Sequence, residues 1–340
     1  MSKRKLSKKQ SLRIKKQQTE LVEQLDHSTT DTPTFSGVVI SHHGTQVEIE
    51  YIDEQHSTQN IRCHVRANLD SVVTGDRILW QAEDELGVIV SIEPRDSTLL
   101  RPDIYGTLRP VASNINQMVI VVAPEPEAFA GLIDRYLVAA ENMQTEVLLL
   151  INKADLIESE KYRQLVELKN IYMTIGYRVL EVSAHTDLGF EALATALKDH
   201  TSIFVGQSGV GKSSLLQTLL PHESIRTGEL SSGKAKGRHT TTHTQLYHFP
   251  SGGNCIDSPG IREFGLWHMS SQDITHGFVD LRDIAANCKF RNCQHEDEPG
   301  CKIKAAVEAG TLYKERFDSY KHILNSLDDV TIKNKNCRQY

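Results

Sequence analysis

The sequence lacks any apolar run that could cross a bilayer, for which about 20 consecutive apolar residues are needed. The N-terminus is basic, but no apolar segment follows it, so it does not fit a secretory signal. These absences predict a cytoplasmic protein that has no membrane partner. A chain of 340 residues is long enough for two or three domains.

An excess of positive charge is also missing, because the formal net charge is −6 at pH 7. The positive charges are nevertheless segregated, since the first 19 residues carry eight Lys and Arg side chains and no acidic one. We interpret residues 1–34 as a basic, flexible arm that neutralises phosphates on a structured RNA. The alternative is a solvated tail that only aids solubility.

Short alternating segments follow in residues 35–100. Apolar and polar side chains alternate over 47–51, 61–65 and 78–80, turn residues separate these segments, and a last strand is expected over 88–92. Five short strands in about 60 residues favour an OB (oligonucleotide/oligosaccharide-binding) barrel. An SH3-like barrel would give a similar pattern, and a barrel with a purely structural role is the alternative to one that binds RNA.

Residues 94–110 contain proline and glycine and are predicted to be a linker, after which strands and helices alternate over 111–273. Continuous apolar runs over 117–123 and 147–151 are typical of buried parallel strands. Further strands are expected over 177–182 and from 203. Helices are expected over 130–143, 159–175 and 188–198. This alternation predicts a parallel sheet wrapped by helices.

A glycine-rich segment lies where the strand at 203 turns into a helix, and it matches a phosphate-binding loop. Its glycines allow bare N–H groups to face an anion at the N-terminus of that helix. The lysine would reach the β- and γ-phosphates, and the first serine after it would bind Mg²⁺. The predicted nucleotide contacts here are Gly206, Gln207, Ser208, Gly209, Val210, Gly211, Lys212, Ser213 and Ser214.

Two loops that precede the phosphate loop have the pattern of a guanine pocket. Asn152, Lys153 and Asp155 form an Asn-Lys-x-Asp sequence directly after a buried strand. The Asp155 carboxylate can accept hydrogen bonds from guanine N1–H and the 2-amino group, whereas adenine offers neither donor. Ser183 and Ala184 end the next strand, as in a loop whose N–H meets the guanine carbonyl oxygen. Loops at adjacent strand ends can form one pocket.

Two further segments fit the mobile loops that sense a γ-phosphate. Asp257 and Gly260 belong to an Asp-x-x-Gly sequence, in which Asp257 would hold Mg²⁺ and Gly260 would donate its N–H to the γ-phosphate. The polar segment 231–244 contains three adjacent threonines, of which we assign Thr241 to Mg²⁺. Guanine loops, phosphate loop and switches therefore occur in a circularly permuted order, and the second switch leads into the C-terminal segment.

A cluster of cysteines near the C-terminus indicates metal rather than disulfides. Its four ligand side chains and the lack of an open position suit one tetrahedral structural Zn²⁺. The polar residues between the ligands could hardly form a core, so metal would stabilise the segment. After the cysteine cluster, the apolar side chains at positions 313, 317, 320 and 324 predict one face of a helix. The predicted zinc ligands are Cys288, Cys293, His295 and Cys301.

These motifs, in this order, resemble the circularly permuted small-ribosomal-subunit biogenesis GTPases, the RsgA (YjeQ) family of bacteria. The resemblance covers nearly the whole chain: basic arm, OB barrel, permuted GTPase domain and cysteine-rich end. It is specific because Gly-Gln-Ser-Gly-Val-Gly-Lys-Ser, His-Thr-Thr-Thr and Asp-Ser-Pro-Gly occur together in permuted order. It implies ribosome-stimulated hydrolysis of GTP to GDP and phosphate during late maturation of the small (30S) subunit, and contact with 16S rRNA. The spacing of the cysteine cluster also occurs in the zinc-binding region of that family.

The expected architecture is multidomain: an OB-type β-barrel over 35–100, a circularly permuted α/β P-loop GTPase domain over 111–273, and an α-helical zinc-binding domain over 274–340. We expect a monomer in which arm, barrel and zinc domain bind RNA while GTP hydrolysis times release from the small subunit. The alternatives are a nucleotide-gated RNA-binding module with negligible hydrolysis, and a translation or signalling GTPase.

The residue after Gly260 is Ile261, where many GTPases have a glutamine that orients water. An isoleucine cannot orient a nucleophile, so intrinsic hydrolysis is expected to be slow. His239, in the segment with the three threonines, is our candidate for a catalytic residue that positions water. The alternative is that His239 is only a polar loop residue.

Overall fold

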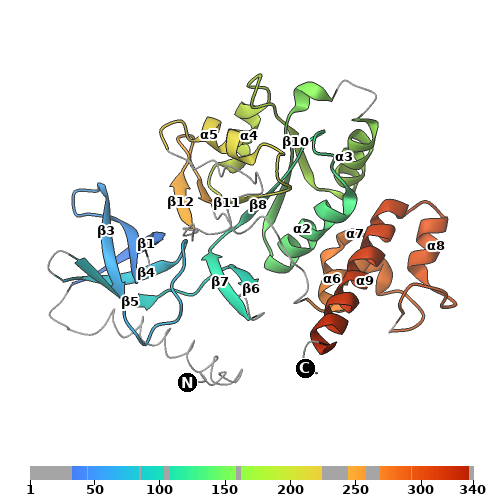
Figure 1. The fold of residues 1–340 in the computed structure, drawn as a ribbon, viewed down its shortest axis with the longest axis horizontal. Helices are drawn as coiled ribbons and strands as arrows, with labels where there is room; N and C mark the ends of the chain where they lie inside the picture. The colour runs from blue at the N-terminus through green and yellow to red at the C-terminus, as the bar shows by residue number, and fades with distance from the viewer. Residues whose placement is uncertain are drawn as a thin grey trace. The chain divides into compact units, whose positions relative to one another are not determined.

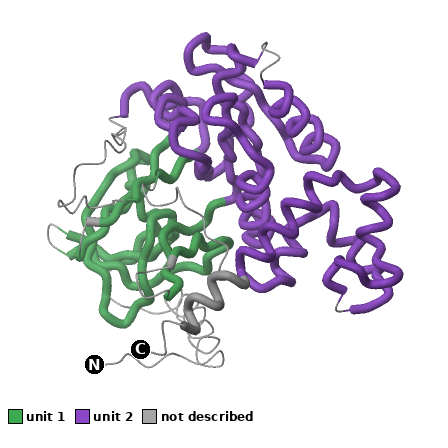
Figure 2. The backbone as a smooth tube through the Cα atoms, turned by 45° about the vertical axis from the view of Figure 1, so that its right-hand side comes forward, with its two compact units in different colours: residues 1–115, 233–248, 254–259 green, residues 116–232, 249–253, 260–340 purple. Residues whose placement is uncertain are grey.

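The computed structural model describes residues 33–43, 45–83, 86–102, 107–157, 162–223, 244–257, 269–291 and 293–336. The chain divides into two compact units (Figure 2). The first comprises residues 1–115, 233–248 and 254–259, and the second comprises residues 116–232, 249–253 and 260–340. Nearly all of the predicted basic arm lies outside the described residues, and the domain boundaries drawn from the sequence stay a prediction.

The first unit contains the predicted five-stranded barrel (Figure 1). Its strands are β1 (Thr34–His43), β2 (Gln46–Ile52), β3 (Thr58–Val65), β4 (Arg77–Glu83) and β5 (Leu86–Ile92). Antiparallel pairs β1–β2, β2–β3, β4–β5 and β1–β4, with the parallel pair β3–β5, close the barrel. Alternate residues point inward and form a core of Val39, Val47, Ile49, Cys63, Val72, Ile78, Trp80, Ile89 and Ile92.

Two hairpins extend the first unit. The predicted linker is wrong in part, because β6 (Thr98–Pro102) and β7 (Leu108–Ser113) form an antiparallel pair. Leu99 and Ala112 are partners in this pair and are both buried, which explains why the segment is ordered. The second hairpin consists of β12 (Gln245–His248) and β13 (Asn254–Asp257), and β12 joins the barrel through the pairing of Ser41 with Gln245.

The second unit contains the predicted parallel sheet. Its strands β8 (Gln117–Val122), β9 (Glu146–Ile151), β10 (Arg178–Glu181) and β11 (Thr201–Val205) lie in the order β10-β9-β8-β11, and every neighbouring pair is parallel. Every residue of β8 is buried, as its continuous apolar run predicted. The connecting helices are α2 (Ala130–Met143), α3 (Arg163–Ile175) and α4 (Phe190–Leu197), and α5 (Lys212–Leu219) follows β11.

Four helices complete the second unit: α6 (Ser271–Gly277), α7 (Val279–Ala285), α8 (Lys302–Glu308) and α9 (Lys314–Asn336). A capping box between Ser270 and Asp273 starts α6. The apolar face predicted for α9 is confirmed at Tyr320, which is 3% exposed, but it is wrong at Tyr313, which is 39% exposed, and it leaves out Arg316, which is only 1% exposed. Among the described residues, no helix is both long and apolar enough to cross a membrane.

Arg316 is buried because it joins α9 to two other helices. Its guanidinium donates to both carboxylate oxygens of Asp280 at 2.7 and 3.0 Å and also pairs with Asp134 of α2. It lies 4.4 Å from the centre of the Phe278 ring. Tyr172 donates to Asp134 at 2.7 Å. Burial raises the pKa of Asp134, and the charge of Arg316 opposes that rise.

We expect Arg316→Ala to lower the free energy of unfolding by about 3–5 kcal/mol, because it leaves the buried carboxylate of Asp134 and the partly buried carboxylate of Asp280 without their cation. Chemical denaturation followed by circular dichroism measures the change. The matched control is Arg163→Ala, which removes an exposed pair with Glu167 and should cost under about 1 kcal/mol. Equal losses for the two variants would show that the buried network contributes no special stability.

Candidate nucleotide-binding site

The phosphate loop lies where β11 passes into α5, as its glycines predicted. A Cβ on Gly206 (φ 140°) would lie 2.2 Å from the Val121 carbonyl oxygen, and one on Gly211 (φ 94°) would lie 2.3 Å from Asn152 Nδ2. Both φ values fall in the region that favours glycine. The loop therefore passes so close to its neighbours that only glycine fits, and α5 begins at Lys212 directly after it.

Lys212 is folded back onto its own loop. Its Nζ donates to the carbonyl oxygens of Gly206 at 2.7 Å and Gln207 at 2.8 Å. The ammonium group therefore lies beside the loop backbone, where it can meet phosphate oxygens at the N-terminus of α5. Ser213 and Ser214 occupy the first turn of the same helix.

The loop after β9 is bonded directly to the phosphate loop. Asn152 Nδ2 donates to the buried carbonyl of Val210 at 2.9 Å, and Lys153 Nζ donates to the carbonyl of Gly209 at 2.9 Å. Lys153 adopts the left-handed conformation, with φ 58°. Asn152 Oδ1 is buried and has no hydrogen-bond partner among the described residues. The structure thus joins two of the predicted site segments, and one acceptor there is free for an incoming donor.

Asp155 and Ser183 meet at the neighbouring strand ends. Ser183 Oγ donates to Asp155 Oδ1 at 2.5 Å and accepts the backbone N–H groups of His185 and Thr186 at 3.3 Å. Ala184 lies between Ser183 and His185 in the same turn and is half-buried. The hydroxyl of Ser183 therefore orients the carboxylate of Asp155, which is exposed, in addition to any contact made by the Ser183–Ala184 backbone.

Sequence reasoning missed the loop that follows β8. The carbonyl oxygen of Glu125 accepts from Lys153 Nζ at 2.6 Å, and its carboxylate accepts from Tyr162 Oη at 2.8 Å. Pro126 lies against the phosphate loop, 3.5 Å from where a Cβ on Gly209 would stand. The position of this loop in the sequence could have identified it, because loops at the carboxyl ends of neighbouring parallel strands lie at the same edge of the sheet.

The remaining predicted residues lie in the first unit or outside the described residues. Asp257 ends β13 in the first unit, where it is half-buried and pairs with Gln245. His239, Thr241 and Gly260 lie outside the described residues. Their assignment to magnesium, γ-phosphate or water stays a prediction.

The four predicted zinc ligands converge in the loop between α7 and α8. One ligand atom from each of them lies within 4.8 Å of all the others. His295 Nδ1 is 3.6 Å from the sulfur atoms of Cys288 and Cys301. Tetrahedral zinc, with Zn–S of about 2.3 Å and Zn–N of about 2.0 Å, would separate sulfur and nitrogen by about 3.6 Å. The cluster, completed by Cys293, therefore fits a zinc ion.

Backbone N–H groups and the burial of His295 also favour a cation in this cluster. The N–H groups of Lys302 and Lys304 point to the sulfur atoms of Cys288 and Cys301 at 3.4 and 3.5 Å. Burial lowers the pKa of His295, which keeps the imidazole neutral, as a metal ligand must be. Left-handed backbone at His295 (φ 62°) turns its ring toward the cysteines.

A parallel sheet whose guanine-type loop precedes and bonds to its phosphate loop, with a barrel before it in the chain, defines a circularly permuted GTPase. Comparison with known proteins agrees, since a family model described as RsgA GTPase matches residues 92–267. Relatives named small ribosomal subunit biogenesis GTPase RsgA, from Saccharophagus degradans and Pseudomonas aeruginosa, are each 49% identical. They cover 98% and 97% of this chain and 99% of their own.

Two solved structures are similar in fold. The crystal structure of YjeQ from Thermotoga maritima is 33% identical, with a TM-score of 0.71 over 87% of this chain and 99% of that one. YloQ, described as a circularly permuted GTPase, is 29% identical, with a TM-score of 0.71 over 89% of this chain and 98% of that one. The chain belongs to the RsgA GTPase family, and it is a GTP hydrolase of that family.

We expect Asn152→Ala to weaken GDP binding about tenfold, which corresponds to the loss of one buried hydrogen bond to the phosphate loop. The preference for guanine over adenine nucleotides should be unchanged, because Asn152 bonds to backbone rather than to Asp155. Titration with fluorescent GDP and ADP analogues measures both quantities. Asn142→Ala is the control, since its amide bonds to Val138 on its own helix and to Asp273 on α6, neither of which belongs to the nucleotide site. Unchanged GDP affinity in Asn152→Ala would show that the hydrogen bond from Asn152 to the phosphate loop does not support nucleotide binding.

Proposed function

We propose that this GTPase acts in late maturation of the small (30S) ribosomal subunit, where GTP hydrolysis on the particle times its release. The observation that carries the nucleotide chemistry is the direct bonding of Asn152 and Lys153 to the phosphate loop. The ribosomal role is supported by relatives of nearly equal length that are named for biogenesis of this subunit.

Guanine is read by Asp155 in this proposal. Its carboxylate is exposed and oriented by Ser183, so it can accept from N1–H and the 2-amino group together. The backbone at Ser183 and Ala184 meets the guanine carbonyl oxygen, and Lys153 packs beside the base. Adenine lacks both the 2-amino group and the N1–H, so it would leave the carboxylate without these donors, which supplies the discrimination.

The phosphates bind between Lys212 and the backbone N–H groups of residues 206–214. Ser213, Thr241 and Asp257 would hold a magnesium ion, which would supply positive charge for the transferred phosphate. Gly260 donates its N–H to the γ-phosphate, and His239 positions the attacking water, since Ile261 cannot.

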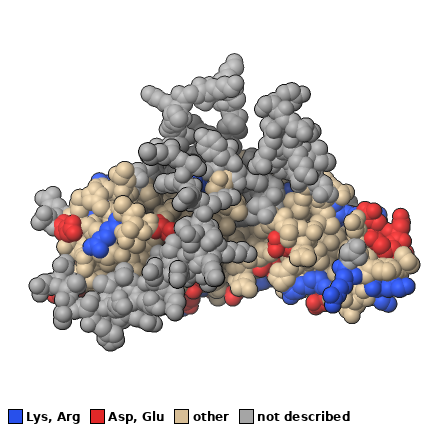
Figure 3. Space-filling view, turned by 90° about the horizontal axis from the view of Figure 1, so that it is seen from below, with Lys and Arg blue, Asp and Glu red and all other residues tan. Residues whose placement is uncertain are grey.

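RNA is bound by the arm, the barrel and the zinc-binding helices. Figure 3 shows Lys and Arg side chains gathered toward the lower right of the view, with Asp and Glu side chains beside them. Lys289, Arg291 and Lys302 of the zinc-binding region are exposed. A basic patch of this kind suits the phosphates of 16S rRNA. The protein acts as a cytoplasmic monomer, and one structural Zn²⁺ fixes the region between α7 and α8.

Purified small subunits should increase GTP turnover by the full-length protein, whereas large subunits should not. Phosphate release is measured as the small-subunit concentration rises. His239→Ala should lower the stimulated rate at least about 100-fold while leaving GDP affinity near normal, because the residue acts on water rather than on nucleotide.

Each alternative predicts a different outcome of this titration. Negligible turnover at saturating small subunits would indicate a nucleotide-gated binding module. Stimulation by large subunits or membranes alone would indicate a translation or signalling GTPase. An unchanged stimulated rate in His239→Ala would remove that residue from catalysis.

The purified chain should contain about one zinc per molecule, and Cys301→Ser should lose most of it, because four ligands are needed to close a structural site. Elemental analysis gives the zinc content, and protease sensitivity of residues 286–301 reports the loss of the cross-link. Cys63→Ala is the control, since Cys63 lies in the barrel core and should leave zinc unchanged. Retention of a full equivalent by Cys301→Ser would contradict the assignment.

A further inference from the structure

A cleft of about 920 Å³ opens among the C-terminal helices of the second unit. Its walls are α6, α7, α9 and the zinc loop, residues 286–301, and Figure 1 shows these helices side by side in orange and red. Every residue that lines it lies between 269 and 327, so it is separate from the nucleotide loops. Ligand pockets have volumes of about 300–1,000 Å³, so the cleft is large enough for a nucleotide.

The floor of the cleft is formed at the zinc-ligand cluster. Cys293 and His295 line it, and His295 is 6% exposed. The centre of the Tyr320 ring on α9 lies 6.1 Å from that of His295, and Tyr320 Oη is hydrogen-bonded to Thr275 Oγ1 of α6 at 3.0 Å. These contacts join α6, α9 and the zinc loop to one another, so the cleft is formed before any ligand enters it.

The charges in the cleft favour an anion. Its lining contains Arg282, Arg291 and Lys321, but only one carboxylate, that of Glu296. Glu296 accepts from Lys321 Nζ at 2.7 Å, so these two charges neutralise each other. Arg282 lies 3.9 Å from its carboxylate neighbours, and Arg291 is exposed and has no ion pair with any described residue. Two guanidinium groups are therefore available for an anion such as phosphate, which arginine can bind through two hydrogen bonds.

The cleft also contains an exposed aromatic ring and several amides. Phe290 lines it and is 42% exposed. The exposed side chains of Gln272, Gln294 and Asn325 line it as well. Any base can stack on an aromatic ring, and amides offer donors and acceptors to the edge of a base. Together with the arginines, these groups suit a nucleotide better than an acidic peptide, which requires only cations.

We propose that the cleft binds one unpaired nucleotide of an RNA, with its base stacked on Phe290 and its flanking phosphates bound to Arg282 and Arg291. A base-paired nucleotide is excluded, because its pairing edge and its faces are already occupied within a duplex. The role rests on the proposed binding of RNA by the zinc-binding region, and it adds the form of the RNA and the residues that bind it.

Phe290→Trp places a fluorescent ring at the stacking position. The full-length, zinc-loaded variant is titrated with a single-stranded RNA of about eight nucleotides, which should quench the new fluorescence, whereas the same RNA annealed to its complement should not. The wild type, with its own two tryptophans, is titrated in parallel as the background. This signal reports the cleft alone, although the arm and the barrel are also proposed to bind RNA.

The same titration tests the phosphate contacts. Adding Arg291→Ala to Phe290→Trp should reduce the slope of log K against log salt concentration by about 0.7, the value for one phosphate contact on a single strand. Zinc content and melting temperature are recorded for each variant, because residues 290 and 291 lie close to zinc ligands in the sequence.

Stimulation of GTP hydrolysis by small subunits gives a second measurement. Phe290→Ala should raise the small-subunit concentration for half-maximal stimulation about tenfold, which corresponds to the loss of one stacked base. Phe290→Tyr retains an aromatic ring and should behave like the wild type. Tyr313→Ala is the matched control, since Tyr313 is an aromatic residue of the same region that is 39% exposed and lies outside the cleft.

Quenching by single-stranded RNA alone, together with the reduced salt slope, would support the proposal. Absence of quenching, equal quenching by the duplex or an unchanged salt slope would overturn it, and quenching by a polyglutamate peptide would assign the cleft to an acidic protein segment instead. Equal effects of Tyr313→Ala and Phe290→Ala would also overturn it. If small subunits do not stimulate the wild type, the proposed ribosomal function fails, and the quenching still decides whether the cleft binds RNA.

Discussion

A buried hydrogen bond from the Asn152 amide to the Val210 carbonyl joins two loops that are 58 residues apart in the chain. The bond is possible because β9 and β11 lie on either side of β8 in one parallel sheet, so both loops leave the sheet at the same edge. Gly211 leaves the space that the amide fills. Together with the bond from Lys153 to the Gly209 carbonyl, this contact restricts how the two loops can move relative to each other, so that one nucleotide can meet both.

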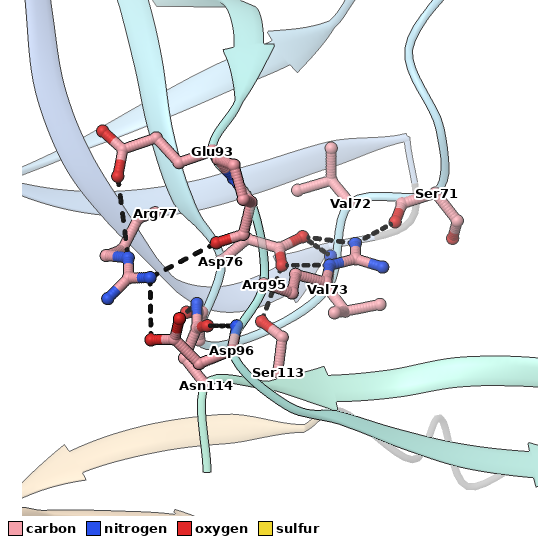
Figure 4. Close-up of polar contacts among 12 residues, drawn as sticks. Ser71, Val72, Val73, Asp76, Arg77, Glu93, Arg95, Asp96, Ser113 and Asn114 are labelled. Carbon is pink, nitrogen blue, oxygen red and sulfur yellow. Dashed lines mark hydrogen bonds and ion pairs between the residues drawn. The ribbon is translucent and has the colours of Figure 1, made fainter. Parts of the chain in front are cut away.

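Buried carboxylates have the same connecting role elsewhere. Asp134 receives Arg316 from α9, and Asp76 receives Arg95 in the barrel (Figure 4). A carboxylate with no exposed surface is costly unless a cation and further donors satisfy it, so each one selects a single arrangement of its partners. The first network fixes the C-terminal helices on α2, and the second fixes the turn that reaches the hairpin β12–β13. Charge is thus used to join elements that are remote in sequence.

Local patterns predicted the regular elements well where burial is uniform. The apolar run that became β8, the glycines before α5 and the four zinc ligands each follow from short-range rules. The linker expected over 94–110 failed because Leu99 is buried against its partner strand. Proline is tolerated there because Pro102 ends β6 and Pro110 lies next to the register shift in the pair. The face predicted for α9 left out Arg316, because a pattern of apolar residues cannot show that this side chain would be neutralised by Asp134 and Asp280.

Residue type and spacing by themselves determined the chemistry available to this protein: a loop that takes phosphate, a carboxylate suited to guanine, and four ligands suited to zinc. These depend on backbone and side-chain properties that act over a few residues. The tertiary structure alone decided that Ser183 orients Asp155, that Glu125 supports Lys153, and that Thr74 reaches Thr244. Such contacts join segments tens to hundreds of residues apart, and only the packing of sheet and barrel brings their atoms within bonding distance.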